Sequence, residues 1–297
     1  MKNLLLSVGL CLVLVSAAFG QKTIERTFDG IDEIDMSLGS GDAVFEKGSG
    51  DKVQLVLRHS FDSYQPTIEK RGDKLFIREE QRNGNWSRSG SATWTFTIPD
   101  GLELEFNTGS GDVSVEGLEM DARVNSGSGD FEIASASGEY KMNTGSGDVE
   151  IRKSEGRYRM NTGSGDVELS DVAADIDANT GSGDIEADGL TVAGSCNLNS
   201  GSGDVEVSLA GPLDYDISVN SGSGDAVVDF NGAKIEGTIV MQANKRHGRI
   251  VAPFKFDTEE EIDNGGSSPT LRKTVKLGDK DVRINIGTGS GTAQVKE

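Results

Sequence analysis

Residues 143–151 read Asn-Thr-Gly-Ser-Gly-Asp-Val-Glu-Ile, and the first six of these letters recur along the middle of the chain with Thr or Ser in second place. The seven copies begin at Asn107, Asn125, Asn143, Asn161, Asn179, Asn199 and Asn220. The first five copies start 18 residues apart, and the last two spacings are 20 and 21 residues. A short fixed period predicts a solenoid, in which each unit buries its apolar face against its neighbours.

Each unit contains two segments in which apolar and polar residues alternate. After the motif, Val149 and Ile151 flank Glu150, and before it Tyr140 and Met142 stand two residues apart. A period of two is typical of half-buried strands and excludes a helix. We therefore expect an all-β fold, a single-chain β-solenoid or β-helix with right-handed coils of about 18 residues and two short strands per coil. Equivalent strands should pair in parallel at about 4.8 Å.

The repeated Asn and Gly positions have structural explanations. An Asn at the same place in every coil can donate an amide hydrogen bond to the next Asn, so we expect a structural ladder. It would run through Asn107, Asn125, Asn143, Asn161, Asn179, Asn199 and Asn220. The two corner glycines indicate either a positive φ or a close approach of stacked corners that a Cβ would prevent.

The Asp of each motif, together with the Glu that follows two residues later in five of the seven copies, predicts an acidic stripe along one face. Its Asp residues are Asp112, Asp130, Asp148, Asp166, Asp184, Asp204 and Asp225. Their oxygens could cap the amides of their own glycine turn, could bind calcium or another cation, or could form a solvated face that aids solubility. Calcium-binding nonapeptide repeats read Gly-Gly-x-Gly-x-Asp, and this motif lacks a residue between Gly and Asp. Apart from this calcium candidate we expect no cofactor and no catalytic residue.

The composition disfavours nucleic acid as a partner. The formal net charge of the chain is −20, and such a surface repels phosphate backbones and anionic lipids.

The N-terminus resembles an export signal. Lys2 is followed by an apolar run to Val15 and by Ala18-Phe19-Gly20, which predicts a secretory signal peptide over residues 1–20. The mature chain would be periplasmic, secreted or on the bacterial surface, and it contains no second run long enough to span a membrane. It would retain one cysteine, Cys196, which we expect to be a buried small hydrophobe. His59 and His247 lack metal-ligand spacing.

We divide the chain into four parts. These are the signal peptide (1–20), irregular β coils with a cap (21–106), the regular solenoid (107–236), and C-terminal β coils with a cap (237–297), with 21–297 forming one continuous domain. Strands are expected at 53–61, 74–78 and 92–98, and loops at 81–91 and 265–269. The acidic run at 258–263 is a candidate for edge protection.

The chain resembles the bacterial putative-adhesin domains of unknown function, which are similar to the head domains of auto-transporter adhesins. The resemblance covers residues 23–295 and rests on Phe28-Asp29-Gly30-Ile31, Thr97-Ile98-Pro99-Asp100-Gly101, the Ser-Gly-Ser-Gly-Asp-Val coils and the closing Ile286-Gly287-Thr288-Gly289-Ser290-Gly291. It implies an exported single-chain β-helix. Thr292 stands where the last Asp would be.

Two hypotheses about function remain open. The first is a cell-envelope or surface module that binds an envelope, surface or polysaccharide partner, or serves as a scaffold, without catalysis. In this hypothesis Arg123, Lys141 and Arg159 make the face opposite the acidic stripe basic. The second is a polysaccharide-active β-helix enzyme. Catalysis needs two carboxylates in different environments, and here the acids are copies of one another.

Overall fold

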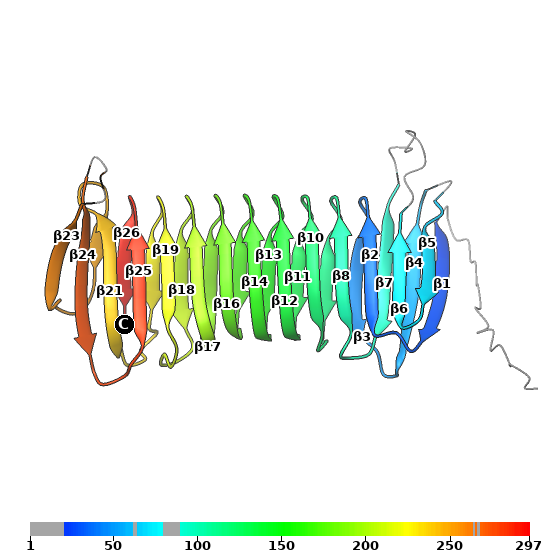
Figure 1. The fold of residues 1–297 in the computed structure, drawn as a ribbon, viewed down its shortest axis with the longest axis horizontal. Coiled ribbons are helices and arrows are strands. Elements are labelled where there is room, and N and C mark those ends of the chain that lie inside the picture. Colours follow the sequence, from blue (N-terminus) through cyan, green and yellow to red (C-terminus); the bar gives the residue numbers. More distant parts are fainter. Residues whose placement is uncertain (1–20, 62–63, 80–89, 264, 266–267) are drawn as a thin grey trace, which may run out of the picture.

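The computed structural model describes residues 21–61, 64–79, 90–263, 265 and 268–297. The predicted signal peptide, most of the predicted loop at 81–91 and part of that at 265–269 lie outside these residues. All the regular elements of the described chain are β-strands, and they form a long flat stack (Figure 1). The all-β solenoid predicted from the repeat is confirmed.

Each regular coil contributes one strand to each of two sheets. We name them the Asn sheet, whose strands lead into the motif Asn, and the Asp sheet, whose strands follow the motif Asp. The central strands of the Asn sheet are β8 (Glu103–Thr108), β10 (Asp121–Ser126), β12 (Ser137–Thr144), β14 (Glu155–Thr162), β16 (Ala173–Thr180) and β19 (Ile217–Ser221). Those of the Asp sheet are β9 (Val113–Glu116), β11 (Phe131–Ala134), β13 (Val149–Arg152), β15 (Val167–Ser170), β18 (Val205–Leu209) and β20 (Ala226–Asp229). The long strand β17 (Ile185–Ser200) passes through both sheets.

Successive coils pair in parallel with the register that the 18-residue period predicts. Asn143 lies beside Asn161 in the Asn sheet, and Val149 lies beside Val167 in the Asp sheet. The alternating side chains point inward in rows, so Val149, Ile151 and Met160 are almost completely buried. Burial of each such side chain contributes about 1.5–3 kcal/mol, and the backbone hydrogen bonds of the ladder are shared with both neighbouring coils.

The two longer units accommodate their extra residues in different ways. In the 20-residue unit the pairing of β16 with β17 shifts between Ala174 and Ile176, so the insertion forms a bulge within a strand. In the 21-residue unit the extra residues lie in the loop at 210–216, where Tyr215 is half exposed. The stack continues unbroken through both units because the rows on either side keep their register.

At the N-terminal end, the order of strands in space departs from their order in sequence. The first coil, β2 (Glu33–Leu38) and β3 (Asp42–Lys47), stacks directly on β8 and β9. The intervening chain turns outward and forms β4 (Lys52–His59), β5 (Thr67–Arg71), β6 (Lys74–Arg78) and β7 (Ala92–Ile98). Strand β1 (Lys22–Asp29) pairs with β4 and closes the Asp sheet, while β5 closes the Asn sheet.

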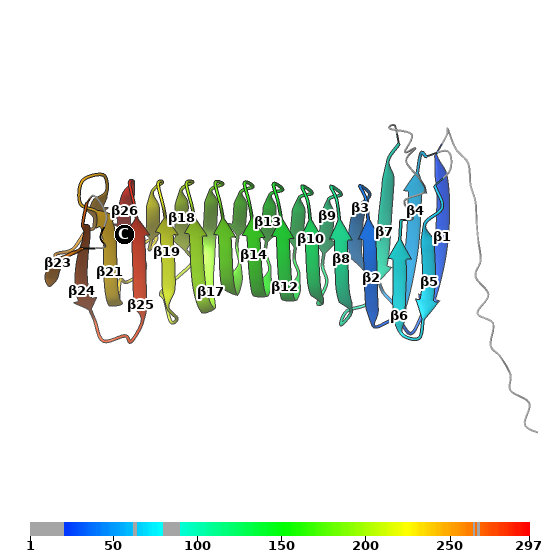
Figure 2. The same ribbon diagram turned by 45° about the horizontal axis from the view of Figure 1, so that its top comes forward.

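The C-terminal end repeats this arrangement. The final coil, β25 (Arg283–Thr288) and β26 (Thr292–Lys296), stacks on β19 and β20. Outside it lie β21 (Gly237–Asn244), β22 (Arg249–Val251), β24 (Thr270–Leu277) and β23 (Thr258–Ile262) (Figure 2). The outermost strand β23 carries the predicted acidic run, and its Glu259, Glu260 and Glu261 are exposed. Charges on an edge strand oppose pairing with another sheet.

Candidate functional surfaces

The corner between the two sheets is held by contacts that only glycine permits. A Cβ on Gly147 would lie 2.0 Å from the carbonyl oxygen of Gly129, and one on Gly145 would lie 2.4 Å from that of Gly127. Among the described residues, the glycines with positive φ lie elsewhere, in the opposite corners and the caps. Of the two explanations that the sequence left open, close approach of stacked corners is therefore the correct one.

The Thr or Ser in second place of the motif caps this corner, a role that the sequence analysis missed. The N–H of Gly147 donates to Oγ1 of Thr144 at 3.0 Å, and this hydroxyl donates to the carbonyl oxygen of Gly129 at 3.2 Å. Thr144 is buried, so the bonds replace water at a backbone N–H that would otherwise be unpaired. The signal was present in the sequence, because only hydroxyl residues occupy this place in the seven copies.

The motif Asn side chains form a continuous row on the outer surface of the Asn sheet. Nδ2 of Asn143 donates to Oδ1 of Asn125 at 3.0 Å, and Nδ2 of Asn161 donates to Oδ1 of Asn143 at 3.0 Å. Equivalent bonds of 3.0–3.3 Å join all the neighbouring pairs from Asn107 to Asn220. Interior amides that bond only within the row thus retain one N–H and one lone pair for a partner outside the molecule. Asn179 is an exception, because its Nδ2 also donates to Oδ1 of Asp177 at 3.0 Å.

The motif Asp side chains bond to the next coil. Oδ1 of Asp130 accepts from the backbone N–H of Asp148 at 2.8 Å, and Oδ1 of Asp148 accepts from the N–H of Asp166 at 2.8 Å. The same bond joins neighbouring coils from Asp42 and Asp112 through to Asp225 and Thr292. Capping of their own turn, which the sequence suggested for Asp, is performed by the Thr or Ser hydroxyl.

The Asp ladder is compatible with its charge. Two carboxylates about 4.8 Å apart in a water-like dielectric repel by about 0.9 kcal/mol. A hydrogen bond to a charged group contributes about 1.5–3 kcal/mol, with the lower end expected at an exposed site. Counted per pair of neighbouring coils, the bond therefore contributes at least as much as the repulsion costs.

These carboxylates line a shallow groove on the Asp sheet, which we call the acidic groove. Its volume is about 460 Å³ and its acidic lining residues are Asp42, Asp112, Asp130, Asp148, Asp166, Glu132, Glu150 and Glu168. Arg152 forms ion pairs with Glu132 and Glu150 and neutralises part of it. The remaining predicted stripe residues, Asp184, Asp204 and Asp225, continue the ladder beyond the groove. In the part of the chain that the structure describes, no three Asp, Glu, His or Cys side chains converge as a metal site.

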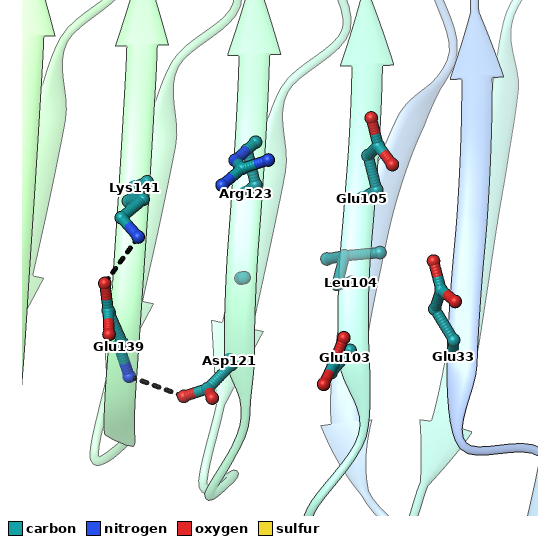
Figure 3. Close-up of a pocket in the computed structure, with 9 residues that line it drawn as sticks. Glu33, Glu103, Leu104, Glu105, Asp121, Arg123, Glu139 and Lys141 are labelled. Atoms are coloured by element: carbon teal, nitrogen blue, oxygen red, sulfur yellow. Dashed lines mark hydrogen bonds and ion pairs between the residues drawn. The ribbon is translucent and has the colours of Figure 1, made fainter.

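The outer surface of the Asn sheet carries a different charge pattern, and a hollow of about 280 Å³ lies on it (Figure 3). Carboxylates from β2, β8 and β10 line one part of this hollow, and Arg123 and Lys141 line the other. Lys141 pairs with Glu139 at 2.6 Å and is the main cause of the lowered pKa of that carboxyl. No ion pair of Arg123 or Glu105 is found among the described residues.

A second group of ions lies farther along the same surface. Asp175 accepts from Arg159 at 3.0 Å and from Arg157 at 3.2 Å. Burial alone would raise the pKa of Asp175, but the two guanidinium groups outweigh this effect and hold the pKa below its ordinary value. The predicted basic residues Arg123, Lys141 and Arg159 lie on this surface, and the structure adds Arg157 to them. Acidic residues of β8 and β16 lie on the two sides of this basic group.

The remaining titratable residues lie apart from these surfaces. Cys196 is buried, and burial raises the pKa of its thiol to about 12. His59 is 2% exposed in the N-terminal cap, where burial lowers its pKa, whereas His247 is exposed in a turn. The described chain contains no helix that is long and apolar enough to cross a lipid bilayer.

Comparison with solved structures identifies similar chains over most of this one. A putative adhesin from Parabacteroides distasonis ATCC 8503 is 12% identical, with 93% of this chain and 96% of that chain covered and a TM-score of 0.48. A protein from the same organism described as a putative lipid binding protein is 18% identical, with 94% and 98% covered and a TM-score of 0.42. A putative cell adhesion protein from Clostridium sporogenes ATCC 15579 is 13% identical, with 93% and 99% covered and a TM-score of 0.23.

Among curated proteins, none matches this sequence. The family model described as Toastrack DUF4097 matches residues 31–248. This match contains the regular solenoid at 107–236, the N-terminal strands from β2 onward, and β21 of the C-terminal end. The chain therefore belongs to the Toastrack DUF4097 family.

Proposed function

We propose that this protein is an exported module of the bacterial cell envelope or surface that binds a partner, or acts as a scaffold, without catalysis. The proposal rests on the hydrogen bonds that hold the outward-facing Asn and Asp side chains in fixed rows. Between Asn107 and Asn220 one amide bond and one Asp bond join every coil to the next, and from Thr144 onward a hydroxyl bond to the preceding coil joins them as well. Both faces are thereby presented as rigid, regular arrays of polar groups.

The environment of the acids supports a binding role over catalysis. Asp130, Asp148 and Asp166 each use Oδ1 for the same bond to the next coil, and each is exposed. Glycosidases separate the roles of their two carboxylates through unlike environments, one of which raises a pKa. Equivalent copies provide no such division of roles. A polysaccharide-active enzyme is therefore the weaker proposal.

The chemistry of the two faces indicates which partners fit. The acidic groove is suited to cationic groups, and a glycan offers hydroxyls that match the free N–H and lone pair of the Asn residues that bond only within the row. Export rests on the charged, apolar and small-residue segments of residues 1–20. We accordingly favour a partner in the envelope, with polysaccharide as its chemical class.

The test starts from the protein as the bacterium makes it. Fractionation of the producing cells and mass spectrometry of the N-terminus should locate the protein outside the cytoplasm, beginning at Gln21. The purified protein should then sediment with intact cells and with isolated envelope polysaccharide in a saturable way. The matched control is the groove variant D130N/D148N/D166N, which removes three charges and keeps the Oδ1 acceptors.

Two results would overturn this proposal. One is retention by cells and polysaccharide no greater than that of an unrelated protein of similar charge. The other is shortening of the polysaccharide, followed by size-exclusion chromatography, which would favour the enzyme instead.

A further inference from the structure

The outward charges of the Asn sheet are arranged in zones along the solenoid axis. Each central strand presents two outward positions before its motif Asn, and neighbouring strands align these positions in two rows. One row contains Lys74, Glu33, Glu103, Asp121, Glu139, Arg157 and Asp175, and the other contains Phe76, Asp35, Glu105, Arg123, Lys141, Arg159 and Asp177. At these positions strands β2 and β8 carry only acidic residues and β14 carries only basic ones. At the outer ends the charge changes again, because β6 carries Lys74 beside the acidic β2 and β16 carries Asp175 and Asp177 beside the basic β14.

At positions equally distant from β10 the charges are opposite in sign, apart from Glu103 with Glu139 and the uncharged Phe76 with Asp177. Strand β10 itself contains Asp121 and Arg123 and is neutral. At equal distances from it lie the acidic β2 and the basic β14, and farther out lie Lys74 of β6 and Asp175 of β16. A surface whose charges change sign on reflection about a line is complementary to a copy of itself that is turned around that line.

We propose that the Asn sheet of one molecule packs face to face on the Asn sheet of a second copy, about a two-fold axis that runs along β10. The axis places Glu105 opposite Lys141 of the second copy and Asp35 opposite Arg159. It also places Glu33 opposite Arg157 and Lys74 opposite Asp175. Symmetry doubles each of these contacts, as in any isologous interface.

The Asn row supports the same arrangement. Turning about β10 brings Asn125 opposite the same residue of the second copy and Asn107 opposite Asn143, because all three share one row. The amide N–H and lone pair that the ladder leaves unused can then pair across the interface. Side-chain amides are both donors and acceptors, so a row of them is complementary to itself.

The size and charge of the surface set its strength. Seven strands about 4.8 Å apart and five residues of about 3.4 Å give about 34 by 17 Å, or about 1,150 Å² buried in total. This lies at the lower limit for specific complexes. Three pairs have like charge. Glu103 faces Glu139, which Lys141 already neutralises, and on the axis itself Asp121 and Arg123 of β10 each face the same residue of the second copy. We therefore infer a weak dimer, with a Kd on the order of 0.1–1 mM.

The in-chain ion pairs affect which contacts contribute most. All the residues of the four proposed contacts except Glu105 already have partners in their own molecule, so for them the second copy extends an existing network. Glu105 has no ion pair among the described residues, and its contact with Lys141 is the largest gain. At about 0.15 M salt the Debye length is about 8 Å, which screens repulsion between distant acids more than contacts between pairs.

A charge swap tests the proposal. The full protein is studied by sedimentation velocity up to about 1 mM at about 0.15 M salt. We expect a concentration-dependent dimer for the native protein, dimerisation weakened by about tenfold or more in E105K and in K141E, and recovery in E105K/K141E. E105Q should weaken it less, without adding repulsion beside Arg123. The matched control is E206K, on the exposed surface of the Asp sheet, which should leave dimerisation unchanged.

Melting temperatures of all variants establish that each one is folded. A native protein that stays monomeric at all these concentrations overturns the proposal, as does a folded double variant that fails to recover. A dimer that E206K disrupts and K141E does not would place the interface on the Asp sheet and also overturn it. Because no envelope component is present in this experiment, its outcome is independent of the proposed binding function.

Discussion

The backbone N–H of Asp148 donates to Oδ1 of Asp130 in the preceding coil at 2.8 Å. One side chain thus contributes both to the outer charge of the molecule and to the bonding between coils. The effect of the charge and the effect of the hydrogen bond can be tested separately, because substitution of Asp by Asn retains the acceptor oxygen while removing the charge.

Asp148→Asn and Asp148→Ala should therefore differ. Both variants lose the charge, but only the Ala variant loses the acceptor for the N–H of Asp166, and we expect its free energy of unfolding in urea to lie about 1 kcal/mol below that of the Asn variant. The Asn variant keeps the bond and loses repulsion from its neighbours, so its stability should be unchanged or slightly higher. Equal loss in both variants would show that charge, and not the bond, is what matters at this position.

Salt should stabilise the native protein by screening the Asp ladder. We expect sodium chloride to raise the melting temperature of the native protein more than that of D130N/D148N/D166N. Calcium at matched ionic strength should add no further increase, since three acidic side chains do not converge as a metal site in the described residues. A calcium-specific increase that the triple variant lacks would instead identify the acidic groove as a calcium site.

The corner glycines should be intolerant of even a methyl group. In Gly147→Ala the new Cβ would clash with the carbonyl oxygen of Gly129, and we expect a loss of about 2–4 kcal/mol in urea unfolding. Gly50→Ala is the matched control, because Gly50 belongs to the related Gly48-Ser49-Gly50-Asp51 turn and a Cβ there would have no neighbouring heavy atom within 4 Å. Similar losses at both positions would contradict the close-approach explanation.

The Asn row predicts a graded effect on stability. Asn143→Ala removes two bonds of the row, which at an exposed site should cost about 1 kcal/mol in total. Asn285→Ala, on β25 and outside the row, should change stability by less than about 0.5 kcal/mol. Thermal or urea unfolding measures both, and an equal effect would indicate that the ladder bonds are not stabilising.

Acid should weaken the N-terminal cap through His59. Burial holds the pKa of this imidazole below its ordinary value of 6.5, so the unfolded chain takes up a proton before the folded one does. The stability contributed by the neutral ring is present above pH 6.5 and is lost as the pH falls through the folded pKa. Between pH 7 and 5 the unfolding free energy should decline less in His59→Gln than in the native protein, while the exposed-site control His247→Gln should follow the native curve.

The repeat predicted the regular part of the fold closely because its period, its alternation and its register all depend on local spacing. The strands at 74–78 and 92–98 were also predicted with their observed limits. The stacking of β3 on β9 could not be predicted, since it joins residues about 70 positions apart and no local pattern specifies a pairing at that distance. The partner of the Asp side chain was also missed. The sequence alone does not distinguish a carboxylate that bonds to its own turn from one that bonds to the next coil.

The charge zones of the Asn sheet were only partly evident from the sequence. Arg123, Lys141 and Arg159 share a place in the repeat and were predicted to form one basic row. Glu33 and Asp35 join the same rows only through the stacking of β2 on β8. The stacking of the first coil on β8 and β9 thus accounts for both features that the sequence did not predict, namely the order of strands at the N-terminal end and the acidic part of the charge rows.

The outward turns at both ends have an evolutionary consequence. Since the first and last coils are held by excursions of the chain that fold back over them, the two closures are independent of how many units lie between. Duplication or loss of a single 18-residue gene segment would lengthen or shorten the rod by about 4.8 Å and leave both closures intact. Molecular length is therefore a trait that selection can adjust in small equal steps.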